Sequence, residues 1–127
     1  MTLEIRLFPC LNDNYGFLVR DTATGTVATV DTPDAAAILA ELEQSGWGPL
    51  DLILNTHWHP DHTQGNAALQ AETGCEIVGP EEVRKAAPLD RVVRGGDTVM
   101  VGETVLEVSD ARGHTVGHVV YGAPSDG

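Results

Sequence analysis

The sequence predicts a single α/β domain in which strands and helices pack in layers. Strand-like patterns dominate the first thirty residues, two helix-like stretches follow, and further strand patterns come after them. A chain of 127 residues provides one domain's worth of polypeptide. Its residues are 42% hydrophobic and 5% aromatic, which indicates a core built mainly from aliphatic side chains.

The predicted strands are short and are separated by turn residues. Leu3, Ile5 and Leu7 occupy every second position of the first strand, the period of a half-buried strand. Asn12, Asp13 and Asn14 predict a turn, and Gly102-Glu103 predicts a two-residue hairpin. By these signals strands are expected at residues 3–8, 15–20, 26–30, 50–55, 75–78, 99–101, 104–108 and 119–122.

Two helices are predicted between these strands. The first has Thr32 as its N-cap and Pro33 as its first residue, and it runs to about residue 44. A second helix is expected at residues 66–72, and a short helical piece at 80–87.

Composition excludes several classes of protein. The net charge of -12, with nineteen acidic and seven basic residues, argues against nucleic acid as a partner. No apolar run approaches the ~20 residues that span a bilayer, and residues 1–10 do not resemble a signal peptide, so a cytoplasmic protein without membrane contact is expected. Cys10 and Cys75 form no C-x-x-C pair and are expected to be buried, reduced thiols.

All five histidines lie in two short segments, residues 57–62 and 114–118. His57 and His59 follow the apolar strand at 50–55. Because residues two positions apart in extended backbone face the same side, both histidines could bind one metal ion. A glycine turn could bring His114 to the same ion, and three nitrogen ligands leave a position open for water. Asp61 and His62 would approach from another side.

Alternatives of a purely structural kind exist for single members of these segments. Asp61 could be the N-cap of a helix beginning at Thr63. His118 is better explained as a surface or hydrogen-bonding residue than as a ligand. Three histidines and an aspartate within six residues nevertheless predict metal binding for the cluster as a whole.

The segments Thr56 to His62 and Gly113 to His118 resemble the two signature segments of the metallo-β-lactamase superfamily. The opening Pro-Cys-Leu-Asn-Asp-Asn-Tyr at residues 9–15 resembles, more narrowly, the N-terminus of the glyoxalase II type, the hydroxyacylglutathione hydrolases. Trp58 and Arg112 depart from the family pattern at positions beside the ligands.

The resemblance implies an αββα sandwich with a two-metal site at the edge of its sheets. It assigns His57, His59 and His114 to the first metal, and Asp61 and His62 to the second. Thr56 and His118 match positions that support the site or are structural. Zinc is the default ion, although iron and manganese suit the same ligands. No residue is assigned to substrate binding.

The resemblance also implies that residues 1–127 are a truncated metallo-β-lactamase-like domain. Family members continue with a Gly-Asp-Thr segment whose aspartate bridges the metals, a further histidine ligand, and a helical domain that holds glutathione. This sequence contains none of these, so the chain by itself is expected to hold one metal ion in place of two. It is also expected to expose an open sheet edge, a surface prone to self-association.

The activity implied for the intact protein is hydrolysis of glutathione thioesters, with S-lactoylglutathione converted to lactate and glutathione. Two cations lower the pKa of a bound water, Asp61 orients the resulting hydroxide, and a thiolate leaves without a general acid. Another superfamily activity is an alternative: persulfide dioxygenase, lactonase or β-lactamase. A third hypothesis is an inactive metal-binding fragment.

Overall fold

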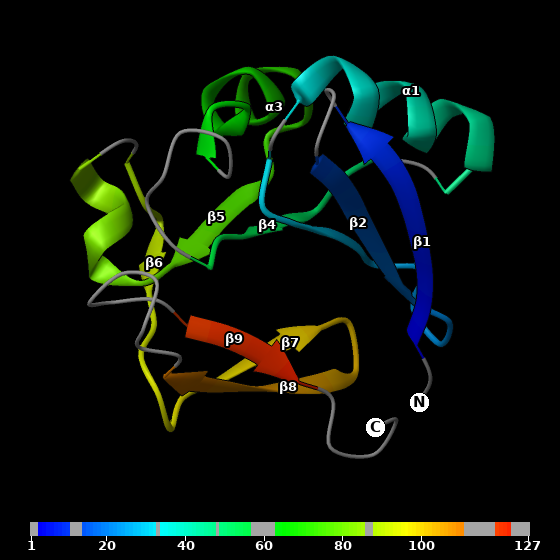
Figure 1. Cartoon of the computed structure of the whole chain (residues 1–127). Coiled ribbons are helices and arrows are strands. Elements are labelled where there is room, and N and C mark those ends of the chain that lie inside the picture. Colours follow the sequence, from blue (N-terminus) through cyan, green and yellow to red (C-terminus); the bar gives the residue numbers. More distant parts are fainter. Residues whose placement is uncertain are drawn as a thin grey trace.

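The structure is a computed structural model that describes residues 3–10, 14–32, 34–47, 49–56, 63–85, 88–110 and 119–122. Its elements, in chain order (Figure 1), are β1 (Leu3–Cys10), β2 (Asn14–Asp21), β3 (Val27–Val30), α1 (Ala35–Ser45), β4 (Leu52–Leu54), α3 (Asn66–Thr73), β5 (Glu76–Gly79), the 3₁₀ helix η1 (Glu81–Lys85), β6 (Arg91–Val92), β7 (Thr98–Val101), β8 (Thr104–Asp110) and β9 (Val119–Gly122).

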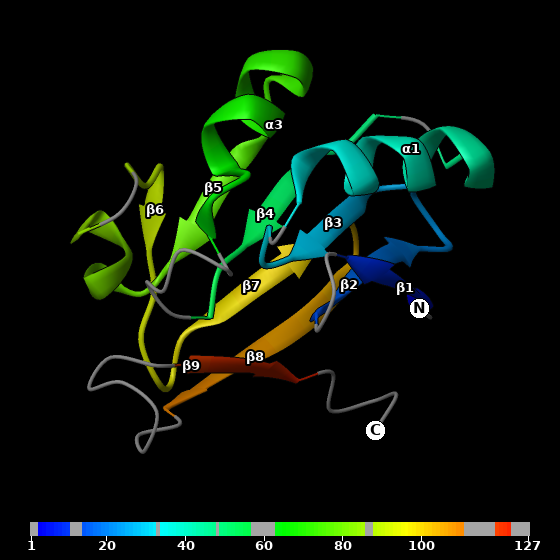
Figure 2. The same ribbon diagram turned by 45° about the horizontal axis from the view of Figure 1, so that its top comes forward.

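The strands form two sheets that pack face to face. The larger sheet has the order β1-β2-β3-β4-β5-β6, antiparallel from β1 to β3 and parallel from β3 to β6. The smaller antiparallel sheet has the order β7-β8-β9. Helices α1 and α3 cover one face of the larger sheet, and the smaller sheet lies against its other face (Figures 1 and 2). The predicted α/β layering is therefore confirmed, with three of the four layers of an αββα sandwich present among the described residues.

The core has two parts because alternate residues of each strand face opposite sides of the larger sheet. The part under the helices is formed by Leu18, Val27, Ile38, Leu42, Leu50, Ile53, Leu69, Cys75 and Ile77. The part between the sheets is formed by Val19, Ala28, Leu52, Leu54, Val78, Val93, Val99, Val101, Leu106 and Val108. Strand β4 contributes to both parts, as expected for a short apolar strand buried on both faces.

The eight predicted strands are all present, each beginning and ending within two residues of its predicted bounds. The hairpin at Gly102-Glu103 is confirmed, because β7 ends at Val101 and β8 begins at Thr104. Of the turn predicted at residues 12–14, the first two lie outside the described residues, and Asn14 begins β2. Strands β7 and β9 are the two edges of the smaller sheet within the described part, and the self-association expected at an open edge stays a prediction.

The predicted start of the first helix was wrong. The N-cap is Asp34, whose carboxylate Oδ1 accepts hydrogen bonds from the backbone N–H groups of Ala36 and Ala37 at 3.1 and 3.4 Å. The hydroxyl of Thr32 points to another part of the chain: it accepts a hydrogen bond from the backbone N–H of Gly65 at 3.2 Å and donates to Asn66. Thr32 and Asp34 are both good N-cap residue types, so the local pattern could not decide between them.

Two further details differ from the prediction. The helical piece expected at residues 80–87 is a 3₁₀ helix of five residues, Glu81–Lys85. Strand β6, Arg91–Val92, was not predicted, because a two-residue strand with both residues exposed carries no periodic signal. Cys75 is a free buried thiol, as predicted, and burial raises its pKa, whereas the side chain of Cys10 lies outside the described set. No helix in the described ranges is long and apolar enough to span a membrane.

A buried aspartate ties the two sheets together. Asp21, the last residue of β2, is fully buried and accepts a hydrogen bond from the backbone N–H of Glu103 at 3.0 Å. It also accepts from the hydroxyls of Thr104 at 2.8 Å and Thr24 at 2.7 Å. Gly102, at φ 59°, lies so close that any Cβ there would collide with the side chains of Asp21 and Thr24. The hairpin between β7 and β8 is thus fixed to the end of β2.

This tie predicts a loss of stability in acid. The N–H of Glu103, with further help from Thr24 and Thr104, lowers the pKa of Asp21 from 3.8 to about 2, although burial opposes the shift. A pKa lower in the folded than in the unfolded chain stabilises the fold above about pH 4, and this stability is lost as the pH falls to about 2. Asp21→Asn should therefore unfold at lower urea concentration than the wild type at about pH 7 and lose less stability over the acid range.

The control for this prediction is Glu43→Gln, which removes one carboxylate from the exposed face of α1. Urea denaturation followed by circular dichroism at several pH values gives both comparisons. Equal acid sensitivity of the Asp21→Asn variant and the wild type would contradict the assignment.

Candidate metal centre

The first predicted histidine segment begins where two parallel strands end side by side. Strands β3 and β4 are parallel neighbours, so the residues that follow them lie at the same edge of the larger sheet. Asp31 and Thr32 follow β3, and Asn55 and Thr56 follow β4. This carboxyl edge is where layered α/β folds commonly place their sites.

Of the residues predicted for the site, the structure describes Thr56. The predicted ligands His57, His59, Asp61, His62 and His114, and the supporting residue His118, all lie outside the described residues. Their role in metal binding stays a prediction, and the structure shows how the chain is held where these segments begin and end. Within the described ranges no group of three or more histidine, cysteine or acidic residues is placed to hold a metal ion.

Asp31 holds the residue that directly precedes His57. Its Oδ1 accepts a hydrogen bond from the backbone N–H of Thr56 at 2.7 Å, and its Oδ2 accepts from the Thr56 hydroxyl at 2.6 Å. The backbone N–H of Asp31 donates to the carbonyl oxygen of Leu54 at 2.9 Å. Asp31 is buried, and its φ of 61° lies in the left-handed region, which costs energy for a residue with a Cβ. The two hydrogen bonds to Thr56 offset that strain.

The far end of the first histidine segment is also fixed to the end of β3. The chain is described again from Thr63, which is buried. Gly65 donates its backbone N–H to the carbonyl oxygen of Thr32 at 2.9 Å and lies so close that a Cβ would come within 3.0 Å of that oxygen. Asp31 and Thr32, adjacent in sequence, therefore hold the two ends of the segment at one place.

The second histidine segment is connected to the same edge by Tyr121. This residue lies on β9, three positions after His118, and its hydroxyl donates to the carbonyl oxygen of Asn55 at 2.7 Å. Burial raises the pKa of Tyr121 far above its usual value of 10.0, so the phenol stays protonated and remains a donor. One hydrogen bond thus joins Asn55, two residues before His57, to Tyr121, three residues after His118.

The chemistry of the predicted donor set fits a divalent metal. Imidazole nitrogens and a carboxylate oxygen suit zinc, iron and manganese, and the predicted set contains no thiolate that would favour zinc alone. Thr56, directly before His57, and Tyr121, three residues after His118, are both held at this sheet edge.

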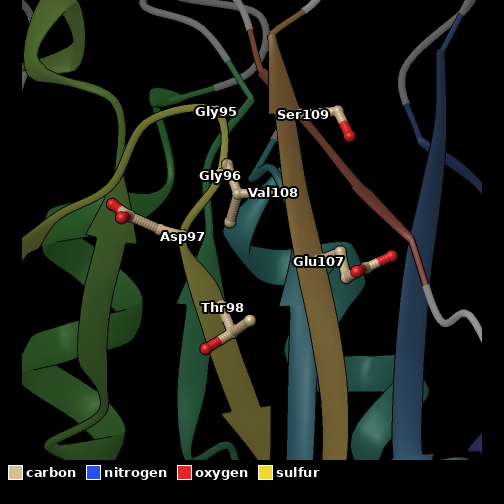
Figure 3. Close-up of a pocket in the computed structure, with 7 residues that line it drawn as sticks. All are labelled: Gly95, Gly96, Asp97, Thr98, Glu107, Val108 and Ser109. Carbon is tan, nitrogen blue, oxygen red and sulfur yellow. The ribbon is translucent and has the colours of Figure 1, made fainter.

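A pocket in the described part lies elsewhere and does not resemble a metal site. It has a volume of about 380 Å³ and lies between the loop before β7 and the end of β8, lined by Gly95, Gly96, Asp97, Thr98, Glu107, Val108 and Ser109 (Figure 3). Asp97 and Glu107 point away from each other, and Asp97 accepts a hydrogen bond from the backbone N–H of Arg94. The two carboxylates therefore do not converge on a ligand.

Sequence reasoning missed Asp31, Asn66 and Tyr121. A usable signal existed for Asp31, because a polar pair follows β3 just as a polar pair follows β4, and parallel neighbours end at the same edge. Asn66 and Tyr121 gave no such signal, since their partners are eleven and sixty-six residues away in sequence.

Residues 17–127 match the family model of the Metallo-beta-lactamase superfamily. This match covers most of the chain, and the chain belongs to that superfamily. The resemblance drawn from the two histidine segments is therefore confirmed.

Within the superfamily, the chain is similar to bacterial proteins named hydroxyacylglutathione hydrolase. The one from Hyphomonas neptunium is 50% identical over 123 residues, which are 96% of this chain and 48% of the relative. The one from Erythrobacter litoralis is 47% identical over 125 residues, 98% of this chain and 49% of the relative. The chain spans about half the length of the curated relatives it matches.

Solved structures share the fold. ETHE1 from Myxococcus xanthus superposes with a TM-score of 0.81 at 29% identity, over 95% of this chain and 54% of that chain. The BLEG-1 B3 metallo-beta-lactamase also superposes with a TM-score of 0.81, over 98% of this chain and 68% of that chain, at 16% identity. The second likeness concerns the fold alone.

The contact between Asp31 and Thr56 should contribute measurably to folding. Asp31→Asn should lower the free energy of unfolding of the metal-free chain by about 2 kcal/mol, because a hydrogen bond to a charged acceptor contributes roughly 1.5–3 kcal/mol. Thr56→Val removes the hydroxyl and should be destabilising, whereas Thr56→Ser keeps it. Urea denaturation of Asp31→Asn, of Thr56→Val and of the double variant measures the coupling between the two side chains. Strictly additive changes in the free energy of unfolding would contradict a direct contact.

Proposed function

We propose that this chain is the metal-binding portion of a hydroxyacylglutathione hydrolase, an enzyme that hydrolyses S-lactoylglutathione to lactate and glutathione. The observation that carries the proposal is the 50% identity with the Hyphomonas neptunium relative along 96% of the chain. The hydrogen bonds that bring the flanks of both histidine segments to one sheet edge support it.

The proposed ligands are those of the sequence motif. His57, His59 and His114 hold the first cation, and Asp61 and His62 hold the second. Zinc is proposed for both because imidazole and carboxylate donors suit it. When bound, the two cations supply Lewis-acid activation of water and of the thioester carbonyl.

The side chains of this chain orient the reactants. Asp61 accepts a hydrogen bond from the attacking water. This hydrogen bond orients the water so that a lone pair of the water oxygen points toward the carbonyl carbon of the thioester. The departing thiolate has an ordinary pKa of about 8.5, so the proposed reaction needs no protonating residue. Because the chain carries a net charge of -12, anionic glutathione must be bound by local groups and not by long-range attraction.

The ligand assignment predicts distinct metal contents for single variants. His57→Ala should abolish tight zinc binding, because a cation held by two imidazoles in place of three is bound far more weakly. Asp61→Ala should keep the fold and the first ion, and when the uncovered half of the Hyphomonas neptunium relative is added at saturating zinc it should lose the second ion that the wild-type mixture holds. His118→Ala is the matched control, because His118 in the second segment is predicted not to be a ligand, and it should bind zinc as the wild type does.

Metal content by mass spectrometry after dialysis, with circular dichroism as the test of folding, gives the comparison. Unchanged metal content in folded His57→Ala would contradict the proposed site, and so would loss of zinc from His118→Ala.

The substrate assignment predicts which thioester is turned over. The chain should be mixed with the half of the Hyphomonas neptunium relative that it does not cover, and offered S-lactoylglutathione or glutathione persulfide. We expect thiol release from S-lactoylglutathione only when both halves and zinc are present, because the chain covers 48% of that relative. A parallel mixture loaded with iron(II) tests the dioxygenase alternative, because zinc has no redox chemistry and cannot activate oxygen. Oxygen consumption with the persulfide in the iron-loaded mixture, and no thioester hydrolysis in either mixture, would overturn the proposal in favour of a dioxygenase.

A further inference from the structure

Two buried asparagines face each other across the ends of the first histidine segment. Asn66 donates through Nδ2 to Oδ1 of Asn55 at 2.6 Å, and Asn55 donates through Nδ2 to Oδ1 of Asn66 at 3.3 Å. The hydroxyl of Thr32 also donates to Oδ1 of Asn66, at 2.6 Å. All three side chains are at most 1% exposed. We call Asn55 and Asn66 the pair, and Thr32 is the third member of the group.

The position of Asn66 in its helix makes this use of the side chain unusual. Asparagine near a helix start commonly caps the helix by accepting hydrogen bonds from its first N–H groups. Here Asn66 is the first residue of α3, the N-cap is Gly65, and no side chain caps the helix. The carboxamide of Asn66 is directed back to the ends of β3 and β4. Its hydrogen-bonding capacity is spent on cross-linking and not on the helix.

Asn55 is itself held from several directions. Its backbone N–H donates to the carbonyl oxygen of Val78 on β5 at 2.8 Å, and its carbonyl oxygen accepts from Tyr121 on β9. Asn66 is therefore joined to a residue that is fixed to β4, to β5 and to the smaller sheet. Helix α3 cannot move relative to these strands without breaking the pair.

The pair brackets four of the five predicted ligands. Asn55 precedes His57 by two residues, and Asn66 follows His62 by four. Fixing both ends of a short segment removes conformational freedom before any ligand binds, so a cation that binds there has less ordering to impose. A pair of apolar residues could fill the same space, but only reciprocal hydrogen bonds set a unique relative position of the two ends.

We propose that Asn66 is a positioning residue for the metal centre, acting through its reciprocal hydrogen bonds with Asn55 to fix the separation between the two ends of the segment that carries His57, His59, Asp61 and His62. The inference rests on the proposed metal-binding function for its effect on metal affinity. The prediction that the asparagine pair fixes the two ends of the segment does not depend on metal binding.

The test compares substitutions of matched size and charge. Asn66→Asp keeps the shape and removes the Nδ2 donors, so it leaves Oδ1 of Asn55 facing another acceptor. Ala67→Asp places the same charge on the next, exposed residue of the same helix turn and is the control. Thr32→Val changes the volume little and removes the hydroxyl that donates to Asn66 and accepts from the backbone N–H of Gly65 at 3.2 Å, and Thr32→Ser keeps the hydroxyl.

Two measurements are made on each variant. Zinc affinity by chelator competition should fall about 10- to 100-fold in Asn66→Asp, the range typical of residues that support metal ligands, and the absorption spectrum of the cobalt-loaded chain should change. Amide hydrogen exchange of the metal-free chain should be about tenfold faster in residues 57–62 of Asn66→Asp while β4 and β5 exchange as in the wild type. Ala67→Asp should match the wild type in both.

Each result decides the inference. Wild-type zinc affinity and wild-type exchange in a folded Asn66→Asp chain would overturn it, and so would exchange that is equally faster in β4 and β5, which indicates general destabilisation. If Asn66→Asp does not fold, Thr32→Val decides, with a smaller loss of affinity that Thr32→Ser restores. If the wild-type chain binds no zinc, the proposed function fails, and exchange in residues 57–62 still supports or overturns the positioning role.

Discussion

The parallel pairing of β3 with β4 is the constraint on which the rest of the described site depends. It places four polar residues, Asp31, Thr32, Asn55 and Thr56, side by side at the end of a buried sheet. Three of the four are fully or almost fully buried, where a polar group without a partner costs roughly 1–3 kcal/mol. Asn66 on helix α3 and Tyr121 on the smaller sheet supply hydrogen-bond partners for these groups. These hydrogen bonds hold the helix and the smaller sheet in place beside the ends of β3 and β4.

The two sheets are joined by polar contacts at separated places on the larger sheet, with aliphatic packing between. One contact is Asp21 at the end of β2, which holds the hairpin between β7 and β8. A second is Tyr121 on β9, which holds Asn55 beyond the end of β4. A third is Arg91 on β6, whose guanidinium donates to the carbonyl oxygen of Thr98 on β7 at 2.8 Å. Apolar packing alone tolerates sliding of one sheet on another, because aliphatic contacts are not directional. Directional contacts at several separated places fix both the position and the rotation of the smaller sheet.

The sequence predicted the layers and the strands because those depend on local periodicity. It could not choose between Thr32 and Asp34 as the helix cap, since the hydroxyl of Thr32 is engaged by Gly65 and Asn66, thirty-three and thirty-four residues away. It could not find β6, whose pairing with β5 leaves both of its residues exposed. For the site, dense spacing made the ligands predictable, whereas Asp31, Asn66 and Tyr121 act through tertiary contacts that have no spacing to detect. The predicted ligands lie in two short segments, whereas the residues that support those segments are spread over the chain.

The chemistry of the supporting contacts makes the framework insensitive to pH near neutrality. Carboxamides do not titrate, the phenol of Tyr121 stays protonated, and Asp21 stays charged until the pH falls toward about 2. Metal ligands must be deprotonated to bind, so the affinity of any metal site falls in acid. Because Asp21, Tyr121 and the two asparagines keep their protonation states between about pH 4 and pH 8, these contacts stay in place around the predicted ligands across that range.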